Sequence, residues 1–376
     1  MKDEFERLHS HKGIVLFLIF ITCIIAGMVL KLTAPVILPF TIALFLAMVL
    51  NPLVGLLERW RLPRIVSIIL AIGLIMAALY LIGVVLFSSV RTILTLYPRY
   101  ERRLTEIYVA LAGFFEFSYD EHLSFFDNLW GQLGVRSRIL GMTLALSNGF
   151  IGFLQEALMV VLFMTFLLLE TTFFKEKIEL AFEHKLSGQI KKIGADVVRQ
   201  ISRYLSAKFF ISLATGIVVA IGLSLTGLEF AVLWGFIQFI LNFIPNIGSI
   251  ATGVGVVLFA LLQFWPEPGP VIVTALIMLG ANMIIGNIVE PKIMGDNLGI
   301  APIAVLMSLM LWGWLWGFVG MILAVPMTVI CKILCENIPM LEPVAIFLGS
   351  RKAVLAKKAE AQARAHPAAG SEPTAL

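Results

Sequence analysis

Residues 230–266 read FAVLWGFIQFILNFIPNIGSIATGVGVVLFALLQFWP, a stretch without any Asp, Glu, Lys or Arg. A transmembrane helix needs about 20 apolar residues, so this stretch is too long for one span and too short for two comfortable ones. Pro245 and Gly248 near its middle favour two short helices folded back on each other. Broken elements of this kind are tolerated at membrane depth where protein or a water-filled cavity satisfies the freed backbone groups. The stretch predicts a helical hairpin within a membrane protein.

The composition of the 376-residue chain points to the same class. It is 60% hydrophobic and 14% charged, and its mean hydropathy is +0.97. Soluble domains carry about 25% charged residues, and a globule of this length has too little interior for so much apolar surface. A soluble enzyme, a nucleic-acid-binding protein and a disordered scaffold are therefore excluded. We expect an all-α polytopic integral membrane protein.

Further spans follow from the gaps between charges. A second overlong stretch, 297–331, predicts a second hairpin, and the helical spacing of apolar residues among charges after residue 171 predicts an amphipathic cytoplasmic helix. The expected division is a cytoplasmic N-terminus (1–12), three transmembrane helices (13–90), an exterior helical insertion (91–147), one transmembrane helix (148–170), the amphipathic helix (171–208), a transmembrane bundle with hairpins at about 230–266 and 297–331 (209–335), and a cytoplasmic tail (336–376) disordered after about residue 350.

Basic residues predict the orientation. They gather before the first span, between the second and third, in the amphipathic helix and in the tail, whereas the turns at 33–34, 226–229 and 265–270 carry none. Because cytoplasmic loops retain Lys and Arg, we expect both termini in the cytoplasm of a bacterial inner-membrane protein. The same rule explains the net charge of +4 without a nucleic-acid partner. The three cysteines and five scattered histidines form no metal-ligand pattern, so we expect no metal and no cofactor.

Motifs of catalysis and of ATP use are missing from the sequence. It has no HExxH, no GxSxG and no Walker GxxxxGK[ST] motif. Since ATP-driven transport needs a nucleotide-binding domain, any transport must be secondary or passive, and we expect no enzymatic activity.

Polar residues inside apolar runs are the candidate functional residues, because burying them in a membrane is costly. The first cluster lies at the middle of the 230–266 stretch and contains Gln238, Asn242, Pro245, Asn246 and Gly248. Gln238 and Asn242 share a helix face, and freed carbonyls beside amides are suited to a substrate or ion site. The alternative is an ordinary loop with amides at the water interface.

The second cluster combines amides, charges and helix breakers: Asn282, Asn287, Glu290, Lys292, Asp296 and Pro302. Asn282, Gly286 and Glu290 fall on one helix face at i, i+4 and i+8. Glu290 could exchange protons or attract a cation, with Lys292 as a nearby tether. The alternative is a carboxylate and a lysine at the cytoplasmic surface, screened by water.

The third cluster consists of small residues and a proline: Gly313, Gly317, Gly320 and Pro326. Gly313 and Gly317 have the GxxxG spacing that lets helices approach closely. We expect this cluster to serve helix packing or oligomer contact.

These motifs, in this order, resemble the autoinducer-2 exporter (AI-2E) family. The resemblance rests on 242-NFIPNIG-248, 290-EPKIMG-295, 298-LGIAP-302 and 317-GFVGMILAVP-326, within about residues 10–345. It implies a bacterial inner-membrane protein of about eight spans and an assembly of identical subunits. Some members of the family export autoinducer-2, and others resemble sodium–proton antiporters.

The chain departs from the family pattern at two positions. Asp296 stands where many relatives have a basic residue, and Ala301 stands where many have histidine. Alanine cannot titrate near neutral pH as histidine can. If that histidine couples transport to protons in relatives, this chain must lack the coupling or use another group, such as Glu290 or Asp296.

Three hypotheses of function follow. The first is a secondary transporter or facilitator that exports a small polar organic solute similar to autoinducer-2. The second is a sodium or other cation/proton antiporter that uses Glu290 or Asp296. The third is a membrane scaffold without transport activity. In each case we expect the lipid bilayer and further copies of the chain as partners.

Overall fold

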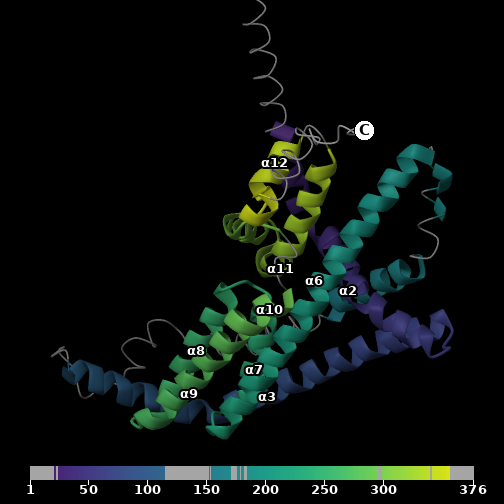
Figure 1. The fold of residues 1–376 in the computed structure, drawn as a ribbon. Helices are drawn as coiled ribbons and strands as arrows, with labels where there is room; N and C mark the ends of the chain where they lie inside the picture. The colour runs from purple at the N-terminus through teal and green to yellow at the C-terminus, as the bar shows by residue number, and fades with distance from the viewer. Residues whose placement is uncertain are drawn as a thin grey trace, which may run out of the picture. The chain divides into compact units, whose positions relative to one another are not determined.

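The computed structural model describes residues 21–22, 24–114, 152, 154–170, 176–177, 179–181, 184–294, 299–338 and 341–355. Over these ranges the chain is helical, and the single β pairing there is an isolated antiparallel bridge between Ile300 and Gly349. The prediction of an all-α membrane protein is confirmed. The main helices (Figure 1) are α2 (Ala34–Arg59), α3 (Arg64–Phe114), α6 (His184–Leu225), α7 (Ala231–Leu241), α8 (Ile247–Phe264), α9 (Pro268–Ala281), η2 (Asn282–Val289), α10 (Glu290–Met294), α11 (Pro302–Asn337) and α12 (Glu342–Leu348).

Within the described residues, the segments that are long and apolar enough to cross a bilayer number six. They are Ala34–Arg59, Arg64–Ile93, Ile190–Leu225, Ile247–Phe264, Pro268–Met294 and Pro302–Asn337. Large aliphatic side chains such as Leu258 and Leu276 are exposed on them, as lipid contact requires. The 11 residues of α7 reach only about 16 Å, about half of the hydrocarbon thickness. The chain is therefore a multi-pass membrane protein that also contains a short apolar helix.

Two helices continue past the positions where the charge pattern predicts a boundary. Helix α3 runs to Phe114 although we expected the span to end at Val90, and α6 passes Lys208 without a break. A change from apolar to charged residues marks a membrane surface, whereas a helix ends at capping or breaking residues, so the two need not coincide. The predicted N-terminal segment 1–12, residues 115–147 of the predicted exterior insertion 91–147 and residues 356–376 of the predicted tail 336–376 lie outside the described residues. Residues 351–355, placed by the sequence in a disordered tail, are helical.

The chain divides into two compact units. The first unit contains Met1–Phe45, Lys175–Ile201 and Leu298–Leu376, and the second contains Leu46–Phe174 and Ser202–Asn297. An apolar core of the second unit joins α6, α7, α8, α9 and the turn between α6 and α7. It contains Val219, Leu223, Leu228, Ala231, Val256, Ala260, Met278 and Ala281.

Close packing in the second unit depends on glycines. A Cβ atom added to Gly216 of α6 would lie 2.6 Å from the carbonyl oxygen of Gly235 in α7, and one added to Gly235 would lie 2.6 Å from Cβ of Ala220. The backbones of α6 and α7 therefore approach more closely than larger residues would allow. On another side of α6, Gly222 leaves room for the side chain of Ile277 from α9.

The turn between α7 and α8 lies at 242–246, in the middle of the 230–266 stretch. Asn246, at the N-cap of α8, has φ 60°. Gly248 then lies so close to the end of α7 that an added Cβ would be 1.7 Å from the carbonyl oxygen of Leu241. Helices α7, α8 and α9 are consecutive neighbours in space (Figure 1). Glycine at position 248 is thus required by the tight reversal.

In the first unit, α11 is interrupted and reverses direction. Trp316 and Gly317 have non-helical dihedral angles, and Gly317 has φ 63°. The hydroxyl of Ser308 donates a hydrogen bond of 2.9 Å to the carbonyl of Ala324, 16 residues later. In a straight helix these residues would lie about 24 Å apart, so the chain must fold back on itself. The element consists of two packed arms, one on either side of Gly317.

The segment before α11 is held by the end of the chain's described part. The amide of Ala301 donates to the carbonyl of Leu348 at 2.9 Å, and the amide of Ser350 donates to the carbonyl of Gly299 at 2.7 Å. These bonds flank the bridge between Ile300 and Gly349. Residues 299–301 are therefore held by residues about fifty positions later in the sequence.

Candidate functional site

Polar side chains from separate helices meet inside the second unit. We call them the polar row: Lys208 and Ser212 of α6, Gln238 and Asn242 of α7, Asn282 of η2 and Glu290 of α10. Each contact in the row joins residues that are far apart in the sequence. All these residues lie in candidate membrane spans or in the short apolar helix α7 with its C-cap residue Asn242, so the row places polar groups inside otherwise apolar segments.

An ion pair forms one end of the polar row. Nζ of Lys208 lies 2.5 Å from Oε1 of Glu290, and the exposed fractions of the two side chains are 2% and 25%. Transferring a lone ammonium out of water would cost several kcal/mol, so the carboxylate is what allows Lys208 to be buried. The lysine that pairs with Glu290 is thus a buried residue of α6 and not Lys292, the neighbouring lysine that the sequence singled out.

Two amide contacts continue the row. Nε2 of Gln238 donates to Oδ1 of Asn282 at 3.1 Å, and Nδ2 of Asn242 donates to the hydroxyl of Ser212 at 3.0 Å. Gln238 and Asn242 are buried. They occupy successive turns of α7 and bind different helices, so α7 is the element that ties the row together.

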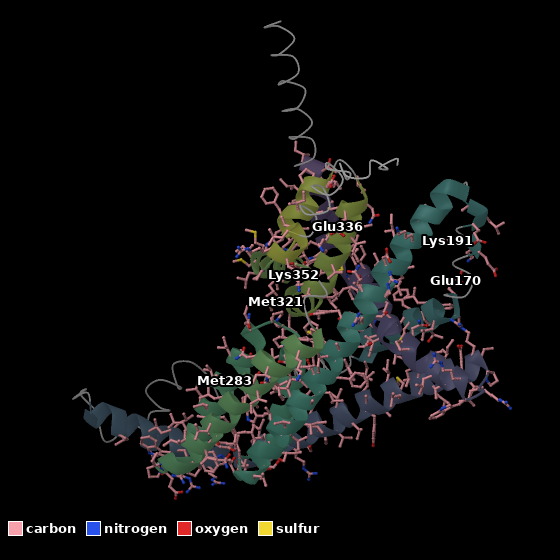
Figure 2. The ribbon with its side chains drawn as sticks, viewed as in Figure 1. Glu170, Lys191, Met283, Met321, Glu336 and Lys352 are labelled. Atoms are coloured by element: carbon pink, nitrogen blue, oxygen red, sulfur yellow. The ribbon has the colours of Figure 1, made fainter. Side chains whose placement is uncertain are left out.

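A π-helix shapes one side of the row. Residues Asn282–Val289 form η2 between α9 and α10, and the amide of Glu290 donates to the carbonyl of Ile285, five residues earlier. Such segments are rare and are frequent at functional sites. The i, i+4, i+8 face expected for Asn282, Gly286 and Glu290 is not formed, because the wider turn leaves Gly286 exposed. Met283 of the same segment, labelled in Figure 2, is 61% exposed.

Some buried polar atoms near this region have no partner. Among the described residues, Oε1 of Gln238 and Oγ1 of Thr274 are buried and make no hydrogen bond. Both side chains are fully buried. Leaving a buried polar atom without a partner costs about 1–3 kcal/mol, and such atoms call for an explanation such as a bound water or ligand.

Nothing in the described part of the chain resembles a metal centre. Over those residues, no group of three or more His, Cys, Asp and Glu side chains is placed to hold a metal ion. Amides, a hydroxyl and an ion pair are instead suited to hydrogen bonding with a polar solute.

The other predicted pathway residues lie outside the polar row. Asn246, Asn287, Lys292 and Pro302 are exposed, and Pro245 is partly buried at the α7–α8 turn. Gly248 is buried beneath the end of α7. The partner of Glu290 is Lys208, whereas Lys292, the expected tether, is exposed. Asp296 lies outside the described residues.

The third cluster has two different structural roles. A Cβ on Gly320 would lie 1.9 Å from the carbonyl oxygen of Trp312, and one on Gly313 would lie 2.9 Å from Cγ of Met321 (labelled in Figure 2). These glycines permit the two arms of α11 to pack, and Pro326 is buried in the second arm. Gly317 meets nothing within 4 Å and instead provides the positive φ of the reversal.

Sequence reasoning missed Lys208 and Ser212. Lys208 is the last residue of the predicted amphipathic cytoplasmic helix, 171–208, and the charge pattern indicates no other role for it. A signal was available, because Tyr204, Lys208 and Ser212 recur every four residues and so share a face of α6. All three are buried. A lysine on the same face as apolar residues that enter a membrane span is a candidate for an internal ion pair.

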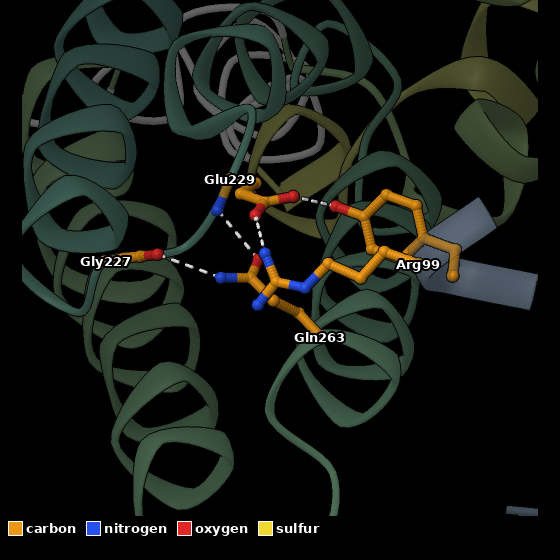
Figure 3. A network of polar contacts seen from close by, with 5 residues as sticks. Arg99, Gly227, Glu229 and Gln263 are labelled. Atoms are coloured by element: carbon orange, nitrogen blue, oxygen red, sulfur yellow. Dashed lines mark hydrogen bonds and ion pairs between the residues drawn. The ribbon is translucent and has the colours of Figure 1, made fainter. Parts of the chain in front are cut away.

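A second polar network lies around the turn between α6 and α7 (Figure 3). The carboxylate of Glu229 accepts hydrogen bonds from Nη1 of Arg99 at 2.9 Å and from the hydroxyl of Tyr100. Gln263 accepts from the amide of Glu229 at 2.8 Å and donates to the carbonyl of Gly227 at 2.9 Å. Burial, and then the hydrogen bond to Glu229 and its negative charge, raise the pKa of Tyr100 above its ordinary value. This network ties α3 beyond its membrane span to the ends of α6 and α8.

Comparison with known proteins identifies similar transport proteins. The model of a family described as "AI-2E family transporter" matches residues 14–340. The chain is 34% identical over 337 residues to the putative transport protein YhhT of Escherichia coli (strain K12), covering 89% of this chain and 94% of that protein. It is 31% identical over 342 residues to the AI-2 transport protein TqsA of the same strain, covering 89% and 95%. It is 28% identical over 343 residues to the sodium-lithium/proton antiporter of Halobacillus andaensis, covering 86% and 95%.

Proposed function

Because the chain belongs to the AI-2E transporter family, we propose that it is a secondary transporter or facilitator that exports a small polar organic solute similar to autoinducer-2. The family and the membrane spans make the chain a multi-pass transport protein of the bacterial inner membrane. The direction of transport, the solute and the cytoplasmic position of both termini are parts of the proposal.

The observation that carries the proposal is the polar row with its unpartnered acceptor. The row places amides and a hydroxyl between α6, α7 and η2, inside segments that are otherwise apolar. Oε1 of Gln238 is buried without a donor. A solute hydroxyl would satisfy this atom, and the neighbouring amides can exchange their mutual hydrogen bonds for bonds to the solute.

Efflux of autoinducer-2 and of a panel of small polyols from deletion cells tests the proposal. Cells with the wild-type chain should lose at least one of these solutes faster than cells without it, and Asn242→Leu and Asn282→Leu should abolish the difference. The matched control is Asn51→Leu, the same change at an exposed amide of α2. Each variant is first shown by immunoblot to reach the membrane in equal amounts. Unchanged efflux across the whole panel, or full efflux with both row variants, contradicts the proposal.

Cation/proton antiport is the second candidate function. It is favoured by the relative from Halobacillus andaensis and by the carboxylate of Glu290 within the row. Addition of sodium to proton-loaded vesicles should then release protons, and Glu290→Gln should stop the release. Export of an organic solute is preferred because Lys208 already neutralises this carboxylate.

A further inference from the structure

We propose that the ammonium group of Lys208 fills a latent alkali-cation site at the carboxylate of Glu290, so that the wild-type protein binds neither Na⁺ nor Li⁺ there. Solute export by this chain is then independent of both ions. That consequence rests on the proposed function, whereas the cation site itself does not.

The ammonium group of Lys208 already occupies the position beside the carboxylate of Glu290. Nζ of Lys208 lies 2.5 Å from Oε1 of Glu290, and only 2% of the lysine side chain is exposed. A carboxylate that is three-quarters buried needs one compensating positive charge, and here the protein provides that charge from its own α6. The lysine takes the place nearest the carboxylate, where a bound alkali ion would lie.

The positive charge of Lys208 repels any further cation at this carboxylate. A further cation at the carboxylate would lie about 4 Å from the ammonium group, and at an effective dielectric constant of about 20 this repulsion weakens its binding about a thousand-fold. Na⁺ or Li⁺ at ordinary concentrations therefore cannot share the site with Lys208. Lys292, the next lysine along the chain, is exposed and does not occupy the site.

Oxygen atoms near Glu290 are suited to bind a small cation once the ammonium group is removed. Hard cations bind oxygen ligands, and the carboxylate of Glu290 together with water provides them. Tyr204 is buried one turn before Lys208 on the same face of α6, which adds a hydroxyl oxygen on that face. Replacing Lys208 by a side chain without the ammonium group would thus leave a negatively charged site with oxygen ligands. The volume of the ammonium group would then be free for one small cation.

Thermal unfolding of the purified full-length chain in detergent tests the inference. The wild type, Lys208→Met and Lys208→Met/Glu290→Gln are each heated in NaCl, LiCl and choline chloride at equal ionic strength. The wild type and the double variant should show the same Tm in all three salts. Lys208→Met should show a Tm about 3 °C or more higher in NaCl or LiCl than in choline chloride, rising with salt concentration.

The matched control is Lys191→Met, which breaks the more exposed ion pair of Lys191 with Glu179 (Figure 2 labels Lys191). It should show no difference between the three salts. The inference is overturned by a sodium-specific shift in the wild type, by equal Tm values for Lys208→Met in all three salts, or by failure of Lys208→Met to fold in any of them. No transported solute enters this assay, so its failure is distinguishable from failure of the proposed export.

Discussion

We predict that Gly248→Ala destabilises the protein, because Gly248 lies in the tight turn between α7 and α8. The added Cβ would lie 1.7 Å from the carbonyl oxygen and 2.4 Å from the carbonyl carbon of Leu241, whereas real Cβ atoms stay beyond 3.0 Å. The shortfall of about 1.3 Å must be met by backbone, because no flexible side chain is involved. Overpacking costs about 1–3 kcal/mol, and a clash with backbone belongs at the upper end, about 3 kcal/mol.

Helix α8 offers a matched control for this change. At Gly253 an added Cβ meets nothing within 4 Å, so Gly253→Ala should be neutral or should stabilise the helix by up to about 1 kcal/mol. The two variants differ only in position within one helix. They separate the effect of the turn from the general effect of replacing a helical glycine by alanine.

Thermal unfolding in detergent measures the difference. Gly248→Ala should lower Tm by about 6 °C or more, whereas Gly253→Ala should leave it unchanged or raise it. Because Asn242 directly follows Leu241, displacement of this turn should also weaken its bond to Ser212 and reduce efflux at equal protein amounts. Equal Tm values for the two variants, within 1 °C, would refute the described turn.

Two further predictions concern other contacts. Lys31→Met removes an ammonium group that lies 4.0 Å from the ring centroid of Trp314, and should cost about 0.5–1 kcal/mol, which chemical denaturation measures against a Lys31→Arg control that keeps the cation. Tyr100→Phe removes a hydrogen bond to Glu229 and should cost about 1 kcal/mol at neutral pH. Because the pKa of Tyr100 is raised on folding, the unfolded state loses the phenol proton first as pH rises past about 10, and the wild type then loses stability. The difference in the free energy of unfolding between the wild type and Tyr100→Phe should therefore become smaller above that pH. The contact of Tyr100 is contradicted if the difference in the free energy of unfolding between wild type and Tyr100→Phe grows above pH 10. The contact of Lys31 is contradicted if Lys31→Met is as stable as the wild type.

Local pattern predicted the membrane class and the break at 242–248. An apolar run of a given length shows whether a segment can cross a bilayer, and proline and glycine show where a helix cannot continue. The reversal at Gly317 was less evident, since glycines at 313, 317 and 320 fit a packing motif as well as a turn. The structure separates these roles through the positive φ of Gly317 and the close contacts of Gly320.

The π-helix shows why spacing arguments fail locally. The sequence assigned Asn282, Gly286 and Glu290 to one face by assuming an α-helix throughout. Hydrogen bonds from i to i+5 widen the turn, so Gly286 leaves that face while Asn282 and Glu290 remain partly buried. No residue in NMIIGNIV requires this geometry, and the packing of the segment against its neighbours is what can favour it.

The sequence by itself determined that this chain is a helical membrane protein with two interrupted apolar stretches, because apolar length and helix breakers act within about 20 residues of the chain. Only the tertiary structure decided which polar groups meet. Asn242 binds Ser212 across 30 residues, Gln238 binds Asn282 across 44, and Lys208 binds Glu290 across 82. The desolvation of each group is offset only by a partner from another helix, and that partner is set by how the helices pack.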